Sequence, residues 1–258
     1  MKRPVCKSEN KVFVPRSSDG PPLGTGRWTT VSTLSLRVLA AALASSAFCA
    51  TSPARANAAC GSSGYAYAGV GATSRAFGIS TRLKASTTPQ VLSGHVAGWV
   101  GVGGPGAGPN GTDEWIQVGF SAFPGSSFSS LYYEVAQPHQ APRYNEIASG
   151  LPPGSTSKVA VVEVAGRSGW WSVRVDDRAV GNAVYLPGSH NAWRPLATTE
   201  AWGAGESVCN RFQYQFGSVS VATRPGGGWQ LLRHGYTFQD HGYRIRRIAR
   251  ATFVAGIV

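Results

Sequence analysis

The stretch Phe212-Gln213-Tyr214-Gln215-Phe216 alternates aromatic and polar side chains residue by residue. Because successive side chains of a β-strand point to opposite faces of its sheet, the rings lie on one face and the amides on the other. The stretch WSVRV (residues 171–175) alternates in the same way. Both stretches therefore predict strands of an antiparallel sheet that is buried on one face.

The same kind of pattern extends outward along the chain. Short runs rich in Val, Trp, Tyr, Phe and Thr recur between clusters of Gly, Pro, Ser and Asn, whereas helix-period patterns are scarce. We predict strands over residues 95–102, 114–120, 130–135, 158–164, 170–176 and 212–222. Because each such sheet must bury a face against another, the sequence predicts an all-β sandwich or jelly roll of two antiparallel sheets.

The N-terminal part is typical of an exported protein. Residues 38–50 (VLAAALASSAFCA) form a short apolar run behind Arg37, and Ala56-Asn57-Ala58 supplies the small residues of a cleavage site. We expect residues 1–58 to be a leader and signal peptide that is removed after about Ala58, so that the protein is secreted. The run is too short for a permanent membrane span, and nothing later is long or apolar enough, so we expect no transmembrane segment.

Charge separates the rest of the chain into two parts. Residues 59–223 carry ten Lys and Arg against nine Asp and Glu, whereas residues 224–258 carry six Arg and one acidic residue, Asp240. We interpret residues 59–223 as one β-sandwich domain and residues 224–258 as a basic C-terminal extension, and we expect no nucleic-acid partner. Within that extension, YRIRRI (residues 243–248) fits either an edge strand or a short amphipathic helix.

Cysteine usage predicts one disulfide. Cys6 and Cys49 fall in the leader, which leaves Cys60 and Cys209 as a lone pair in an exported chain. Outside a reducing cytoplasm such a pair is expected to be oxidised, so we predict a disulfide between them.

Several common catalytic motifs are missing. The chain contains no G-x-S-x-G, C-x-x-C or H-E-x-x-H sequence. The glycine-rich run 101–108 precedes a strand-like stretch, so it has no helix N-terminus that could bind a phosphate. The five histidines are scattered through polar, Gly-rich surroundings, and we therefore expect no metal site and no cofactor.

An ordered series of motifs resembles the eqolisins, the glutamic peptidases. GWVGVGG (98–104), WIQVG (115–119) and LYYEVAQP (131–138) correspond in order to the family's "W-V-G-I-D-G", "Q-x-G" and "W-Y-E-W-x-P" strands. WWSVRVDD (170–177), TEAW (199–202) and FQYQFGSVSV (212–221) are similar to its later strands. The likeness spans about residues 60–223 and is that of a divergent, bacterial-type secreted member.

This resemblance implies a fold, an activity and a set of site residues. The fold is a concanavalin A-like jelly roll of two seven-stranded sheets, and the activity is that of an acid endopeptidase acting on protein or peptide substrates, as a monomer. Gln117 matches the catalytic Gln and Glu134 a supporting Glu. The catalytic Glu falls on Glu200, with Glu206 as the alternative.

The chemistry of these residue types fits peptide hydrolysis. A carboxylate can take a proton from an attacking water, and the amide of Gln117 can donate to the oxyanion that forms. We expect Trp99, Tyr133 and Trp202 to line the substrate as an apolar wall.

Two other functional classes stay open. One is a non-catalytic relative that binds glycan or extended peptide on the same face, which is favoured by the aromatic residues and by Gly103 in place of the family's Asp. The other is a structural or surface protein without a small ligand.

Overall fold

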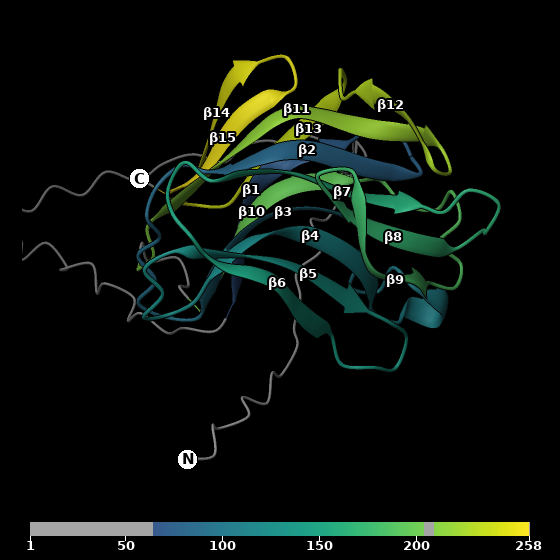
Figure 1. Ribbon diagram of the computed structural model, residues 1–258, viewed down its shortest axis with the longest axis horizontal. Coiled ribbons are helices and arrows are strands. Elements are labelled where there is room, and N and C mark those ends of the chain that lie inside the picture. Colours follow the sequence, from purple (N-terminus) through teal and green to yellow (C-terminus); the bar gives the residue numbers. More distant parts are fainter. Residues whose placement is uncertain (1–63, 204–208, 258) are drawn as a thin grey trace, which may run out of the picture. The chain divides into compact units, whose positions relative to one another are not determined.

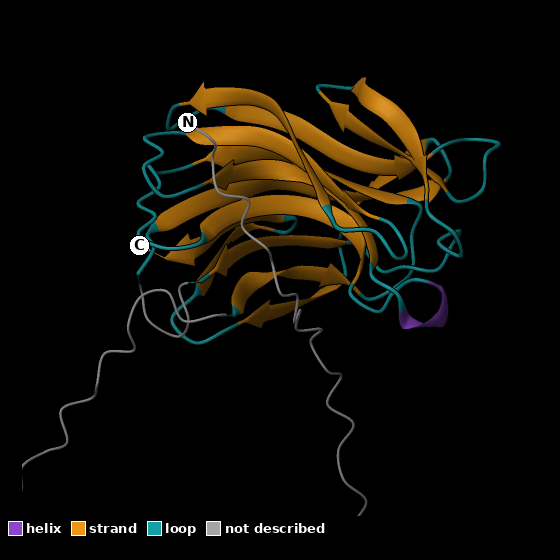
Figure 2. Cartoon of the chain, turned by 90° about the horizontal axis from the view of Figure 1, so that it is seen from below, coloured by secondary structure: helices purple, strands orange, loops and turns teal. Residues whose placement is uncertain are grey.

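The computed structural model describes residues 64–203 and 209–257 (Figure 1). Within these residues it has fifteen strands and one short 3₁₀ turn, η1 (Pro109–Gly111), which Figure 2 shows in purple. The expected leader and cleavage site, Cys60 and Glu206 lie outside the described residues. No helix in the described part of the chain is long and apolar enough to cross a bilayer.

The first sheet has seven strands in the order β13-β1-β10-β3-β4-β5-β6, and all neighbours are antiparallel. Its strands are β1 (Tyr65–Ala72), β3 (His95–Gly104), β4 (Glu114–Ala122), β5 (Ser129–Ala136), β6 (Arg143–Leu151), β10 (Leu196–Trp202) and β13 (Gly235–Gln239). The central strands β10, β3, β4 and β5 carry the motifs that the sequence singled out.

The second sheet has eight antiparallel strands. Seven follow the order β14-β15-β11-β2-β7-β8-β9, and β12 pairs in addition with β11. Its strands are β2 (Gly78–Ala85), β7 (Thr156–Glu163), β8 (Trp170–Val175), β9 (Arg178–Tyr185), β11 (Phe212–Arg224), β12 (Gly227–Leu231), β14 (Arg244–Ala249) and β15 (Thr252–Ile257).

The core lies between the two sheets. The rings of Phe212, Tyr214 and Phe216 on β11 are buried and belong to one apolar cluster with the inner face of the first sheet. Tyr214 packs 6.3 Å from Phe120 of β4, centroid to centroid. Gly98 of β3 makes room for this contact, because a Cβ there would lie 2.6 Å from the Tyr214 ring. The alternation in residues 212–216 thus places its aromatic rings in the core.

The sequence-based fold class is confirmed. All six predicted strands are present as β3, β4, β5, β7, β8 and β11, and they form a sandwich of two antiparallel sheets. The second sheet has eight strands where the family resemblance implied seven.

The segment expected as a basic extension is part of the sandwich. Residues 227–257 form four strands, of which β13 joins the first sheet and β12, β14 and β15 join the second. Of the two interpretations of residues 243–248, the edge strand is confirmed, because β14 ends the order of the second sheet. Its exposure explains the composition, since arginine is tolerated on an edge strand whose side chains face water.

Candidate functional site

The candidate site lies on the outer face of the first sheet, away from the core. Residues paired across antiparallel strands share a face, so the register assigns each side chain. Glu200 on β10 pairs with Ala97 on β3, two residues from Trp99. Gln117 on β4 pairs with Glu134 on β5. Because Trp99 and Gln117 alternate with buried core residues of β3 and β4, all four motif side chains project from the outer face.

Two glycines bring these side chains close to the sheet surface. A Cβ on Gly101 would lie 2.9 Å from the Cβ of Gln117, and one on Gly119 would lie 2.8 Å from the Cβ of Trp99. Neither position can hold a larger residue without moving its neighbour. The G-V-G and Q-V-G parts of the motifs are therefore explained by the packing of Trp99 and Gln117.

Glu200 is held at both carboxylate oxygens. Trp99 Nε1 donates to Oε2 at 2.9 Å, and His95 Nε2 lies 3.0 Å from Oε1. Glu200 is only 7% exposed, whereas the His95 side chain is 25% exposed. The carboxylate is thus fixed in orientation by a contact at each oxygen.

His95 is itself held by aromatic rings. The Trp202 ring stacks on it at 6.2 Å with an interplanar angle of 14°, and Tyr65 and Phe123 lie at 6.1 and 5.9 Å. Trp202 therefore contacts the site through His95.

Gln117 is linked to a tyrosine hydroxyl. Its Nε2 donates to the Tyr132 Oη at 3.2 Å, and Gln117 is 7% exposed. Burial, together with the charges of Glu200 and Glu134, raises the pKa of Tyr132 well above its usual value. Tyr132 therefore stays a neutral phenol that accepts from Gln117 and retains its own O–H as a donor.

Glu134 is the second carboxyl group of the site. Burial, and then the charge of Glu200, raises its pKa to about 7, against the opposing effects of the Trp115 hydrogen bond and of His95. Trp115 Nε1 donates to its Oε1 at 3.0 Å. Below neutral pH, Glu134 is therefore mostly protonated and can itself donate a hydrogen bond.

The structure places most of the predicted site residues together. Gln117, Glu134, Glu200, Trp99 and Trp202 share the outer face. Gln117 on β4 and Glu200 on β10 form no direct hydrogen bond, and the strand between them, β3, carries Trp99.

Tyr133 does not line this face, contrary to the sequence-based expectation. It packs against the core cluster, and its hydroxyl lies close to Gly181 on β9, 2.9 Å from where a Cβ would be. Alternation along β5 is the reason, because Tyr132 and Glu134 point outward and Tyr133 must then point inward.

Two predictions involve residues outside the described part. Glu206 lies there, so only Glu200 has a described position among the two candidate glutamates. Cys209 is buried, and since Cys60 is not described, the disulfide stays a prediction.

Sequence reasoning missed His95, Tyr132 and Trp115. Tyr132 and Trp115 were within reach, because each lies two residues from a predicted site residue on the same predicted strand and so shares its face. His95 required knowing that β10 pairs with β3, a contact between residues 105 positions apart.

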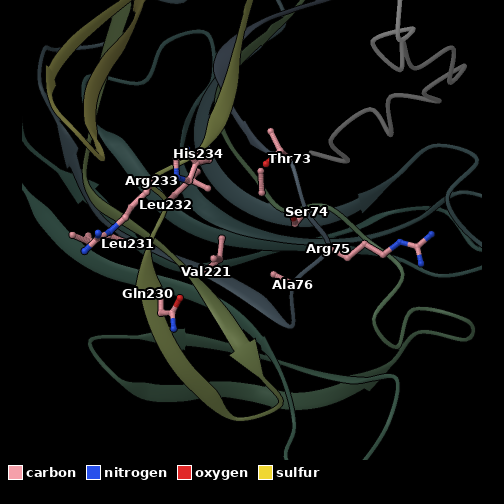
Figure 3. A pocket seen from close by; sticks show the side chains of 11 residues that line it. Thr73, Ser74, Arg75, Ala76, Val221, Gln230, Leu231, Leu232, Arg233 and His234 are labelled. Carbon is pink, nitrogen blue, oxygen red and sulfur yellow. The ribbon is translucent and has the colours of Figure 1, made fainter.

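An open pocket of about 690 Å³ lies elsewhere (Figure 3). The turn after β1, strands β11 and β12 and the loop that follows β12 line it, and it includes Arg75, Arg233 and His234 but no residue of the candidate site. Among residues 64–203 and 209–257, no group of three or more His, Cys, Asp or Glu is placed to hold a metal ion.

Comparisons with known proteins support the fold described above. No protein-family model and no curated protein matches the chain. Two crystal structures of scytalido-glutamic peptidase, each with a transition state analog, match with a TM-score of 0.52 and 13% identity. Each alignment covers 76% of this chain and 99% of the other. The protein therefore shares the fold of a glutamic peptidase of the eqolisin group.

Proposed function

We propose that the protein is an endopeptidase of the glutamic-peptidase type, in which Glu200 and Gln117 activate a water molecule against a peptide bond. The observation that carries this proposal is the outer face of the first sheet. There, a buried glutamate and a buried glutamine project from the same side, each held by a hydrogen bond to a neighbouring aromatic residue. The shared fold supports the proposal, because the matching protein is itself a peptidase.

In the proposed reaction, Glu200 acts first as a base. Its carboxylate takes a proton from water while the water oxygen bonds to the scissile carbonyl carbon. The negative charge that develops on the carbonyl oxygen is stabilised by the Gln117 amide N–H and the Tyr132 O–H. Glu200 then gives its proton to the leaving nitrogen as the carbon–nitrogen bond breaks, so that the carboxylate is restored.

Glu134 suits a supporting role in this scheme. Its raised pKa keeps it mostly neutral in mild acid, where a second anion would otherwise oppose charge on the carbonyl oxygen. Activity should therefore be favoured below about pH 7. As part of the same proposal, the protein acts as a monomer, is secreted after cleavage near Ala58 and carries the Cys60–Cys209 disulfide.

A second candidate function is non-catalytic binding of glycan or extended peptide. A series of ring contacts favours it, because Tyr65, Trp202, His95, Phe123 and Tyr144 form a continuous aromatic path along the face. Phe123 and Tyr144 are about 40% exposed, so rings are available for a ligand. Both candidates use the same face and differ in whether a bond is cleaved.

The distinguishing experiment is incubation of the full chain with a denatured protein between about pH 3 and 7, with products identified by mass spectrometry. We expect internal cleavage, with each pair of fragments together heavier than the parent by one water. Gln117→Ala should lower kcat/KM by about 10²- to 10³-fold, as for loss of one oxyanion donor. A folded wild-type protein that binds peptide without cleaving it would overturn the peptidase proposal in favour of the second candidate.

A further inference from the structure

The outer face of the second sheet carries an array of basic side chains. Lys84 on β2 pairs with Gln215 on β11, Gln215 with Val254 on β15, and Val254 with Arg246 on β14. Paired residues share a face, so Lys84 and Arg246 project from the same side. The adjacent residues Leu83 and Phe216 are fully buried in the core. The face that carries Lys84 and Arg246 is therefore the one turned away from the first sheet.

More cations join the same face. Arg82 pairs with Lys158 of β7, Arg174 of β8 pairs with Ala160, and Arg244 pairs with Gly256. From β14 to β8 this array crosses five strand spacings, or about 24 Å at ~4.8 Å each. In Figure 1, strands β14, β15, β11 and β2, which carry most of the array, lie side by side.

Five of these cations form no ion pair with any residue of the described part of the chain. Lys158 pairs with Asp177 at 2.7 Å, but within the described residues no ion pair involves the other five. These five, which we call the basic array, are Arg82, Lys84, Arg174, Arg244 and Arg246. All are exposed except Arg174, which is half-buried. Like charges gathered without counter-charges repel one another, and an anionic ligand relieves that repulsion.

We infer that the basic array binds a linear acidic polysaccharide. Guanidinium groups bind carboxylate and sulfate groups through paired hydrogen bonds. Gln213 and Gln215 lie between the cations of β14 and those of β2, and their amides can donate to and accept from sugar hydroxyls. A polymer with a regular charge repeat can contact several strands at once, which a small anion cannot.

The composition of the face favours a polysaccharide over single-stranded nucleic acid. Nucleic-acid surfaces of this kind combine basic residues with aromatic rings on which bases stack. In the described residues, the part of the face between β14 and β2 is built mainly from Arg, Lys, Gln, Ser, Thr, Val and Gly. Its aromatic side chains lie at the margins of the array, with Trp229 on β12 beside Ala222 of β11 and Trp170 on β8, the strand that carries Arg174. This inference is independent of the proposed peptidase, because the array and the candidate site lie on opposite faces of the sandwich.

The test uses the full chain with heparin and polygalacturonate as acidic probes and neutral dextran as the reference, measured by calorimetry at several NaCl concentrations. We expect both acidic polymers to bind, dextran not to bind, and affinity to fall with salt. The double variants Arg82→Gln/Lys84→Gln and Arg244→Gln/Arg246→Gln should each weaken binding about tenfold, with a shallower salt dependence.

The matched control removes two positive charges at the pocket of Figure 3. Arg75→Gln/Arg233→Gln lowers the net charge equally and should change affinity by less than about twofold. An equal loss in this control would show that net charge alone attracts the polymer and would overturn the inference. Equal or tighter binding of oligothymidine, or of vesicles with anionic lipid, would overturn the assignment to polysaccharide.

Discussion

Trp99 Nε1 donates a hydrogen bond to Glu200 Oε2 at 2.9 Å, and both side chains are buried. The bond joins the neighbouring strands β3 and β10, although Trp99 and Glu200 lie 101 residues apart in the sequence. It replaces water on one carboxylate oxygen by a fixed donor, so the orientation of Glu200 depends on the Trp99 ring.

Trp99→Phe tests this dependence. The substitution keeps an aromatic ring against Tyr132 and removes the donor to Glu200. We expect unfolding in urea to show a loss of about 1–3 kcal/mol, because a hydrogen bond to a charged group is broken. In peptide cleavage, kcat should fall, whereas KM should change less. Full activity with an unchanged urea midpoint would contradict a role for Trp99 in holding the carboxylate.

His95 is predicted to be a positioning residue for Glu200. His95→Ala removes the contact to Oε1 and should lower kcat/KM about ten- to hundredfold, because the carboxylate can then rotate. His95→Gln retains an N–H donor and should restore part of the activity. The rates are compared with those of His234→Ala, which changes an exposed histidine at the distant pocket. If the Ala and Gln variants lose the same activity, bulk among the surrounding rings matters and the hydrogen bond does not.

Adjacent tyrosines on β5 should behave differently. Tyr132→Phe removes the hydroxyl that accepts from Gln117 and that is proposed to donate to the oxyanion, so we expect kcat/KM to fall about 10²-fold or more. Tyr133→Phe changes a hydroxyl on the inner face and should leave the kinetics unchanged. The measurement is kcat/KM of both variants, and circular dichroism checks that each variant is folded. The opposite ranking would mean that β5 is shifted by one residue.

Glu114 is predicted to make stability depend on pH. It is fully buried, neither carboxyl oxygen has a hydrogen-bond partner within the described residues, and burial raises its pKa to about 7. Between about pH 4.5 and 7 the folded state thus holds more protons than the unfolded state, so stability falls as pH rises. The full effect is about 3 kcal/mol.

The check is urea unfolding at pH 4.5 and pH 8 for the wild type and Glu114→Gln. The free energy of unfolding of the wild type should be lower at pH 8 than at pH 4.5. For Glu114→Gln, the difference between the two pH values should be smaller. Glu134 contributes in the same direction, so some dependence will remain. If Glu114→Gln shows the same difference in stability between the two pH values as the wild type, the pKa of Glu114 is not raised by folding, and the prediction is contradicted.

The strands predicted from the sequence are those with long apolar or alternating runs, whereas the buried strands β1, β2 and β10, which are rich in Ala, Gly, Ser and Thr, were not predicted. Strands β3, β4 and β11 carry long apolar or alternating runs because they lie in the middle of the sheets. Strands β6 and β9 were missed, since both are largely exposed and contain polar residues and glycine. Strands β12 and β13 are likewise largely exposed and were missed. Strand β15 was missed although it is buried, and β14 was left open between an edge strand and a short helix.

At the site, contacts between strands that follow one another in the sequence were predictable, whereas contacts between strands far apart in the sequence were not. The pairing of Gln117 with Glu134 follows from adjacent strands, whereas the contacts of Glu200 with His95 and Trp99 depend on β10 lying beside β3. The error at Tyr133 came from treating neighbours on one strand as sharing a face.

The central claim is that Glu200 is the base of a peptide hydrolase, and the most direct test is kcat/KM of Glu200→Gln against that of Glu146→Gln. Glu146 lies in the same row of the first sheet as Tyr132 and is exposed, so the control removes a carboxyl group from the sheet without touching Glu200. We predict a loss of about 10²-fold or more for Glu200→Gln and wild-type cleavage for Glu146→Gln. Equal cleavage by both variants would contradict the account.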